Sequence, residues 1–183
     1  MDRAGNLVSN TYTINFSYGS GIMAEGTGIL LNNEMDDFSA KPGVPNAYGL
    51  LGGEANAIEP GKRPLSSMTP TLVFKDGRPW LATGSPGGSR IITTTLQILL
   101  NVIDHEMNIA EATAAPRVHH QWWPDELRVE PGLSPDTMAL LRARGHDVVV
   151  KPTMGSTQSI MVTEDGITGA SDPRRPGALT IGY

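Results

Sequence analysis

The alternation of residue types near the N-terminus predicts a β-strand from Val8 to Phe16. Val8, Tyr12, Ile14 and Phe16 share one face (Asn10 is the exception), and Ser9, Thr11, Thr13 and Asn15 share the other. This period of two is that of a strand. One polar sheet face is commonly solvated, yet this face carries no Lys or Glu, which a wetted surface usually has.

Further strands are predicted along the chain from apolar runs and turn signals. "GILLNN" (28–33) predicts a short buried strand, and "TLVFKDGRPWLATG" (71–84) predicts a hairpin that turns at Asp76-Gly77. "DVVVK" (147–151), "SIMVTEDGITGAS" (159–171) and "ALTIGY" (178–183) supply the last strands, with one pair joined at Asp165-Gly166.

Helices are expected between the first and last strands. Residues 91–103 repeat apolar side chains at helical spacing. Asn108 and Glu111 form a capping box for a short helix that ends before Pro116, and a third helix begins at Ser134-Pro135 and ends at Gly145. Strands at both ends with helices grouped between them predict an α+β fold.

Residues 34–64 form a loop of about thirty residues, rich in Gly and Pro, which is longer than compact domains usually contain without a functional reason. Loops of this length are often lids or binding loops, and the alternative is plain disorder. We expect one domain over 1–183 that contains a lid at 38–62.

Composition narrows the class of protein. The 183 residues are 39% apolar, contain no Cys and carry a net charge of −5. A chain of this kind predicts a soluble globular domain with no membrane span and no disulfide, and the lack of a basic cluster argues against nucleic-acid binding. "MDRAGNLVSN" has no apolar core of the kind a signal peptide needs.

The most distinctive candidate for chemistry is "TGSPGGSR" (83–90), a glycine turn between a strand and a helix. It lacks the Lys of a phosphate-binding P-loop and the GxGxxG spacing of a dinucleotide site. Adjacent glycines at such a junction can direct backbone N–H groups at an anion or at an oxyanion. An ordinary structural turn is the alternative.

Other polar clusters are less specific by themselves. Ser66-Ser67 could bind a carboxylate, and the acidic "NNEMDDF" (32–38) could bind a cation or could simply be solvated. His119-His120 lack a third ligand at metal spacing, so we expect no metal and no cofactor. No GxSxG nucleophile motif occurs.

Taken in order, "TYTIN", "GILLNNEMDDFSAKPGVPN", "KRPLSSMTPT", "TGSPGGSRI" and "MGSTQSIMV" closely resemble the small subunit of gamma-glutamyltranspeptidase. The resemblance implies an N-terminal-nucleophile hydrolase with a four-layer αββα sandwich, shared with a large subunit. It implies autoprocessing and acyl transfer from gamma-glutamyl amides such as glutathione through a glutamyl-enzyme ester. It also implies a periplasmic or extracellular location.

The resemblance assigns roles to individual residues. Gly87 and Gly88 are similar to the oxyanion-hole pair, and Ser66 and Ser67 to the hydroxyls that bind the α-carboxylate of the substrate. The α-amino group is read at the positions of Asn15, Glu34 and Asp37. Glu34 stands where other members have Gln, which adds a negative charge.

Two more roles follow from the resemblance. Thr13 is similar to a Thr that hydrogen-bonds the nucleophile, and Tyr48 to the aromatic gate of the lid. The family's nucleophilic Thr precedes the position of Met1 and is absent from this sequence, so we expect this chain alone to be inactive. Half of a layered sandwich is also expected to need its large subunit.

Alternative functions remain open. Within the same fold, the chain could belong to a beta-lactam side-chain acylase or to a relative that processes poly-gamma-glutamate. In another class, it could be an inactive fragment or a non-catalytic subunit that binds glutamate.

Overall fold

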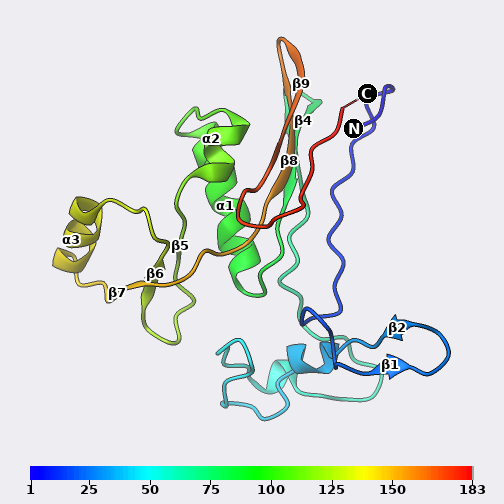
Figure 1. Cartoon of the computed structure of the whole chain (residues 1–183). Helices are drawn as coiled ribbons and strands as arrows, with labels where there is room; N and C mark the ends of the chain where they lie inside the picture. The colour runs from blue at the N-terminus through cyan, green and yellow to red at the C-terminus, as the bar shows by residue number, and fades with distance from the viewer. Residues whose placement is uncertain (183) are drawn as a thin grey trace. The chain divides into compact units, whose positions relative to one another are not determined.

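The computed structural model describes residues 1–182, which group into two compact units (Figure 1). Unit 1 comprises Met1–Thr11 and the chain from Met68 onward, and unit 2 comprises Tyr12–Ser67. The predicted domain over 1–183 includes Tyr183, which lies outside the described residues.

Unit 1 is built on an antiparallel sheet in the order β3-β4-β8-β9. The strands span Thr71–Lys75, Arg78–Gly84, Gln158–Thr163 and Gly166–Ser171. Asp76 and Gly77 both have positive φ (52° and 74°), which is the geometry of a two-residue type I′ hairpin turn. The predicted hairpin at Asp76-Gly77 is therefore confirmed. Strands β8 and β9 also form a hairpin, but its turn residues are Glu164 and Asp165, one position before the predicted Asp165-Gly166, because Gly166 already pairs with Thr163 as the first residue of β9.

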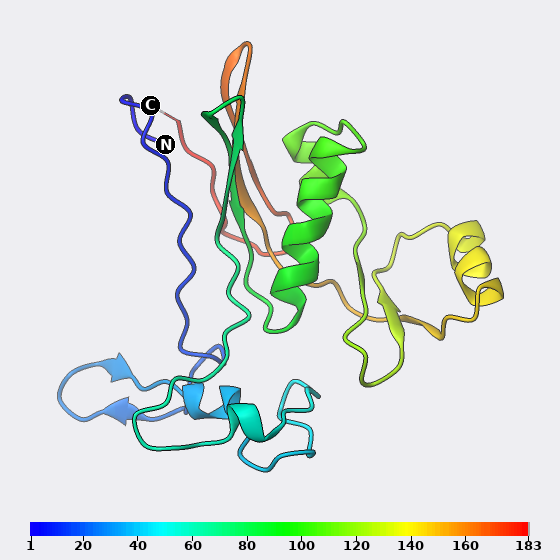
Figure 2. The same ribbon diagram turned by 180° about the vertical axis from the view of Figure 1, so that it is seen from behind.

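Two helices cover one face of this sheet, as Figures 1 and 2 show. They are α1 (Arg90–Ile103) and α2 (Ile109–Ala114). The capping box predicted at Asn108 and Glu111 is present, with the Asn108 side chain accepting from two backbone N–H groups of the first turn. The core between sheet and helices consists of Leu81, Ile98, Val102, Ile109, Ala112 and Ala170.

A smaller sheet completes unit 1. Strand β5 (Val118–His119) pairs antiparallel with β6 (Leu127–Val129), which pairs parallel with β7 (Val148–Val150). Helix α3 (Pro135–Ala143) forms the crossover between the two parallel strands and begins and ends where the sequence predicts. Helices grouped between strands confirm the predicted α+β class.

Unit 2 contains little regular structure. It has the two-residue strands β1 (Met23–Ala24) and β2 (Ile29–Leu30) and the short 3₁₀ helices η1 (Glu34–Asp37) and η2 (Glu54–Asn56). The strand predicted at 28–33 thus shrinks to two residues, and Ile29 is exposed rather than buried. The predicted lid, 38–62, follows η1 and contains η2.

Two predicted strands do not form in the described residues. Residues 8–16 lie outside every sheet, and so do residues 178–182 of "ALTIGY". The reason is that a strand requires a neighbour that completes its hydrogen-bond ladder. At residue 9 the attachment is through a side chain, since Ser9 Oγ donates to the carbonyl of Thr83 at 2.8 Å.

Candidate functional site

The glycine turn lies between the end of β4 and the start of α1. Gly87 and Gly88 have φ values of 142° and 60°, which L side chains rarely adopt, so glycine is required at both positions. Their carbonyls accept hydrogen bonds from Arg90 N–H and Ile91 N–H at the helix start. Neither glycine N–H donates to an acceptor within residues 1–182, so both donors are available to a ligand.

Residues 154–157 support this turn from behind. A Cβ built on Gly87 would lie 3.8 Å from Gly155 Cα, which is van der Waals contact. Gly155 has φ of 70°, and a Cβ there would come within 2.7 Å of Ser85 Oγ and 3.0 Å of the Thr94 side chain. The close approach of the two segments therefore depends on the absence of a side chain at residue 155.

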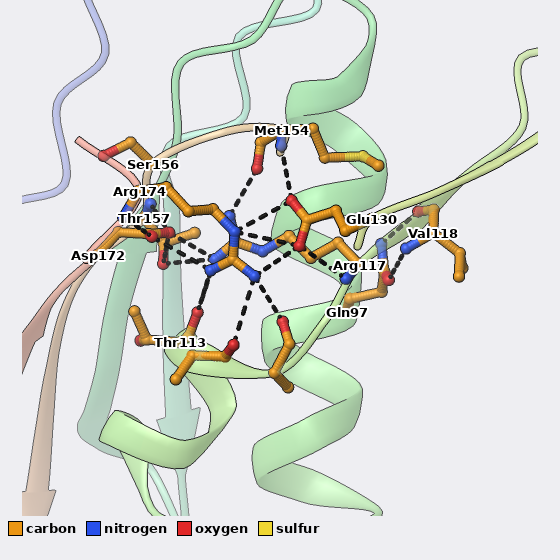
Figure 3. Close-up of polar contacts among 12 residues, drawn as sticks. Gln97, Thr113, Arg117, Val118, Glu130, Met154, Ser156, Thr157, Asp172 and Arg174 are labelled. Carbon is orange, nitrogen blue, oxygen red and sulfur yellow. Dashed lines mark hydrogen bonds and ion pairs between the residues drawn. The ribbon is translucent and has the colours of Figure 1, made fainter. Parts of the chain in front are cut away.

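A buried network of two arginines and two carboxylates, shown in Figure 3, holds the 154–157 segment. Arg117 donates to Asp172 at 2.6 Å and to the Met154 carbonyl at 2.7 Å. Arg174 donates to Glu130 at 2.6 Å. The opposite charges balance within the network, which is the condition under which buried ions are tolerated.

The same network also fixes backbone N–H groups of the segment. Glu130 accepts from Met154 N–H at 2.6 Å, and Asp172 accepts from Thr157 N–H at 2.9 Å. Burial alone would raise the pKa of Asp172, but hydrogen bonds from the N–H groups of Arg174 and Thr157 and from the Arg117 guanidinium hold it below its usual value. The carboxylate therefore stays charged and keeps its donors.

In unit 2, Thr13, Asn15 and Tyr48 are joined by hydrogen bonds. Asn15 has φ of 69°, and its N–H donates to Thr13 Oγ1 at 2.7 Å. Its amide group donates to the Asn33 carbonyl at 3.1 Å and accepts from the Tyr48 hydroxyl at 2.9 Å. Both ends of the Asn15 amide are thus fixed, and the predicted gate residue contacts a predicted substrate-binding residue directly.

The tight turn that carries Tyr48 is held by Asn46. The Asn46 side chain accepts from the N–H groups of Tyr48 and Leu50, both at 3.0 Å. The Tyr48 ring also packs edge-on against Phe16, with 5.6 Å between ring centroids. No periodic pattern in the sequence indicates Asn46, although Asn in a Gly- and Pro-rich loop is a common turn signal.

Glu34 and Asp37 lie on η1, and their carboxyl groups interact with one another. The pKa of Asp37 is raised to about 6, first by burial and then by the negative charge of Glu34, a hydrogen bond shared with Glu34 and the charge of Asp36. Two carboxyl groups this close repel one another when both are ionised. A cation such as an ammonium group relieves that repulsion and receives charge-assisted hydrogen bonds.

The segment with Ser66 and Ser67 is tethered to the same turn through Asn56. The Asn56 side chain donates to the Asp37 carbonyl at 2.7 Å and accepts from Leu65 N–H at 3.0 Å. Ser66, the next residue, is exposed, and Ser67 is half-buried. Asn56 was missed by sequence reasoning, because its partners lie nine and nineteen residues away in a loop without periodicity.

The described residues offer no metal centre and no membrane segment. Nowhere in residues 1–182 are three His, Cys, Asp or Glu side chains grouped so as to hold a metal ion. His119 is buried, which lowers its pKa, and its ring nitrogens pair with Thr93 and Gln121. None of the helices in 1–182 combines the length and the apolar character needed to cross a bilayer.

The predicted site residues thus fall into two groups. Unit 2 contains Thr13, Asn15, Glu34, Asp37, Tyr48, Ser66 and Ser67, and unit 1 contains Gly87 and Gly88. Within unit 2, hydrogen bonds join three of them directly, and Asn56 connects the η1 turn to the paired serines.

Comparison with known proteins identifies the family and the fold. Residues 1–182 match the model of the gamma-glutamyltranspeptidase family. A glutathione hydrolase proenzyme from Escherichia coli K12 is 66% identical over the whole chain, which spans 32% of that relative. Two solved gamma-glutamyltranspeptidase structures have the same fold. The one from Helicobacter pylori is 57% identical with a TM-score of 0.92, and the match covers 96% of this chain and 97% of the other. The one from Pseudomonas nitroreducens, complexed with L-DON, is 47% identical with a TM-score of 0.93, and the match covers 100% of this chain and 96% of the other.

The fold class is therefore α+β, of the N-terminal-nucleophile hydrolase type. The chain belongs to the gamma-glutamyltranspeptidase family, and the family resemblance of its motifs is confirmed. It spans about a third of the length of the curated relatives it matches.

Proposed function

We propose that this chain is the small-subunit part of a gamma-glutamyl hydrolase and transferase that acts on glutathione and related amides. The observation that carries the proposal is the opposed carboxyl pair of Glu34 and Asp37 on η1. It is tethered through Asn56 to the paired serines, which lie in the same unit as the fixed amide of Asn15. An α-amino acid head group presents the ammonium and carboxylate that such groups bind.

In the proposed reaction, a threonine hydroxyl attacks the gamma-glutamyl carbonyl, the amine leaves, and water or an acceptor amine cleaves the resulting ester. The N–H groups of Gly87 and Gly88, which have no acceptor within residues 1–182, stabilise the oxyanion. Thr13 assists by hydrogen-bonding the nucleophile. We take the nucleophile to be the threonine that the family resemblance places before the position of Met1.

A large subunit is the proposed partner, in a periplasmic or extracellular enzyme. The exposed side of helix α1 supports this proposal. It carries an apolar stripe, about half exposed, that consists of Ile92, Leu96, Leu100 and Ile103. A continuous stripe of this kind on a soluble domain marks an interaction surface. A surface of the large subunit would cover it.

Substrate discrimination tests the proposal. We expect the assembled enzyme to prefer gamma-glutamyl-p-nitroanilide over glutaryl-p-nitroanilide, which lacks the α-amino group, by about ten- to a hundred-fold in kcat/KM, the value of a charge-assisted hydrogen bond. Glu34→Gln, which keeps the acceptor and removes one charge, should reduce the preference. A preference for the glutaryl compound would favour the acylase alternative, and no turnover of either would favour the non-catalytic alternative.

The pKa of Asp37, raised to about 6, predicts a pH dependence of donor binding. As pH falls through about 6, Asp37 takes up a proton, and the pair loses one of the charges that attract the ammonium group. The dissociation constant of L-glutamate should therefore rise as pH falls from 7.5 to 5, and binding near pH 6 should release protons. Calorimetry in two buffers of different ionisation enthalpy measures both quantities. Asp37→Asn is the control, and an unchanged pH dependence in that variant would contradict the assignment.

A further inference from the structure

Ser85 joins the glycine turn to the segment behind it through a relay of two hydrogen bonds. Ser156 N–H donates to Ser85 Oγ at 3.0 Å, and the Ser85 hydroxyl donates to the Pro86 carbonyl at 2.8 Å. Ser85 and Ser156 are 3% and 4% exposed, so the Ser85 side chain is shielded from water. The acceptor at the end of the relay is the peptide group between Pro86 and Gly87.

That peptide group is also the one that carries the Gly87 N–H. A peptide is planar, and in the trans form its N–H points opposite to its C=O. A hydrogen bond that fixes the direction of the Pro86 carbonyl therefore fixes the direction of the Gly87 N–H as well. Such fixing matters here because Gly87, at φ of 142°, has no side chain to restrict rotation of this peptide.

We propose that Ser85 is a positioning residue that orients and polarises the Gly87 N–H as an oxyanion donor. The inference rests on the proposed acyl-transfer function. A carbonyl that accepts a hydrogen bond makes the N–H of the same peptide a stronger donor, because hydrogen bonds in a chain polarise one another. Ser85 thus acts through the peptide group and does not itself touch the substrate.

The start of the relay is itself fixed. Ser156 lies two residues after Met154 and directly before Thr157, and the buried ionic network holds both Met154 and Thr157. The Ser156 N–H therefore donates from a rigid backbone. Through Ser85, the buried ionic network also fixes the direction of the Gly87 N–H. This gives the network a consequence for catalysis as well as for stability.

Ser85→Ala in the assembled two-subunit enzyme tests the inference. Deleting one oxyanion donor outright costs about 10²–10³ in kcat, and losing only its orientation should cost less, about ten-fold. Because the oxyanion exists only in the transition state, the competitive inhibition constant of L-glutamate should not change. Ser85→Cys, with a weaker donor in the same space, should give a kcat between those of the wild type and Ser85→Ala. If Ser85→Ala lowers the melting temperature markedly, the kcat of Ser85→Cys tests the inference in its place.

Thr95→Val is the matched control. Thr95 is a buried residue of α1 whose hydroxyl has no hydrogen-bond partner in the described chain, so its loss changes polarity without touching the relay. The inference is overturned if Ser85→Ala keeps the wild-type kcat, if its loss equals that of Thr95→Val, or if glutamate inhibition weakens in parallel with kcat. Absence of gamma-glutamyl turnover in the wild-type enzyme would instead overturn the proposed function, so the two failures are distinguishable.

Discussion

Replacement of Arg117 by methionine is expected to lower the free energy of unfolding by about 3–5 kcal/mol, the cost of removing one partner from a buried ion pair. Methionine fills similar space but cannot donate to Asp172, Thr113 and Met154, which receive hydrogen bonds from Arg117. Asp172 is fully buried, so it cannot recover these bonds from water. The residual negative charge is what makes this substitution severe.

Urea unfolding of the assembled protein measures this loss, and Arg175→Met is its control. Arg175 is exposed and follows Arg174 directly, so its replacement should change stability by no more than about 0.5 kcal/mol. A loss in Arg117→Met no larger than in Arg175→Met would show that the network does not stabilise the fold.

The pH dependence of stability provides a second measurement on the same variant. The folded pKa of Asp172 is depressed, so its contribution is present above the unfolded pKa and is lost as pH falls toward the folded value. Arg117 is one cause of that depression. The free energy of unfolding should therefore decrease less over this acidic range in Arg117→Met than in the wild-type protein.

Elements with local signals were predictable from the sequence. The hairpin at Asp76-Gly77 is set by two residues that accept positive φ, and α2 begins at a capping box contained in Asn108 and Glu111. The strand expected at 8–16 fails for the opposite reason. Alternation shows that a segment could line a sheet, but only a neighbouring strand can supply the ladder, and that neighbour is not a local property.

The candidate site divides in the same way. Gly87 and Gly88 stand out because a strand, a turn and a helix meet there in sequence. The roles of Ser66, Asn15 and Glu34 came from family resemblance and remain predictions, since isolated hydroxyls and carboxylates are common in loops.

The supporting residues could not be found from the sequence. Arg117 and Asp172 are fifty-five positions apart, and each resembles an ordinary surface charge until the fold buries both. Ser85 likewise gains its partner, Ser156, from a segment seventy-one residues away.

Replacement of Gly155 by alanine is expected to lower the free energy of unfolding by about 2–4 kcal/mol, because the strain of a positive φ and the overpacking add together. The added Cβ would lie 2.7 Å from Ser85 Oγ and 3.0 Å from Thr94 Cγ2, and both side chains are buried. Gly77→Ala isolates the strain, because Gly77 has φ of 74° with no atom within 4 Å of the new methyl group. It should cost only about 1–2 kcal/mol.

Activity separates the two glycine variants further. Alanine at 155 must displace Ser85, so its kcat should fall together with stability even at temperatures where the protein remains folded, whereas Gly77→Ala should keep the wild-type kcat. Steady-state kinetics well below the unfolding transition, paired with urea unfolding of both variants, measures the two effects independently. Equal stability losses in the two variants would contradict the close packing at Gly155. A Gly155→Ala enzyme with reduced stability but full kcat would show that the glycine turn keeps its geometry without the segment behind it.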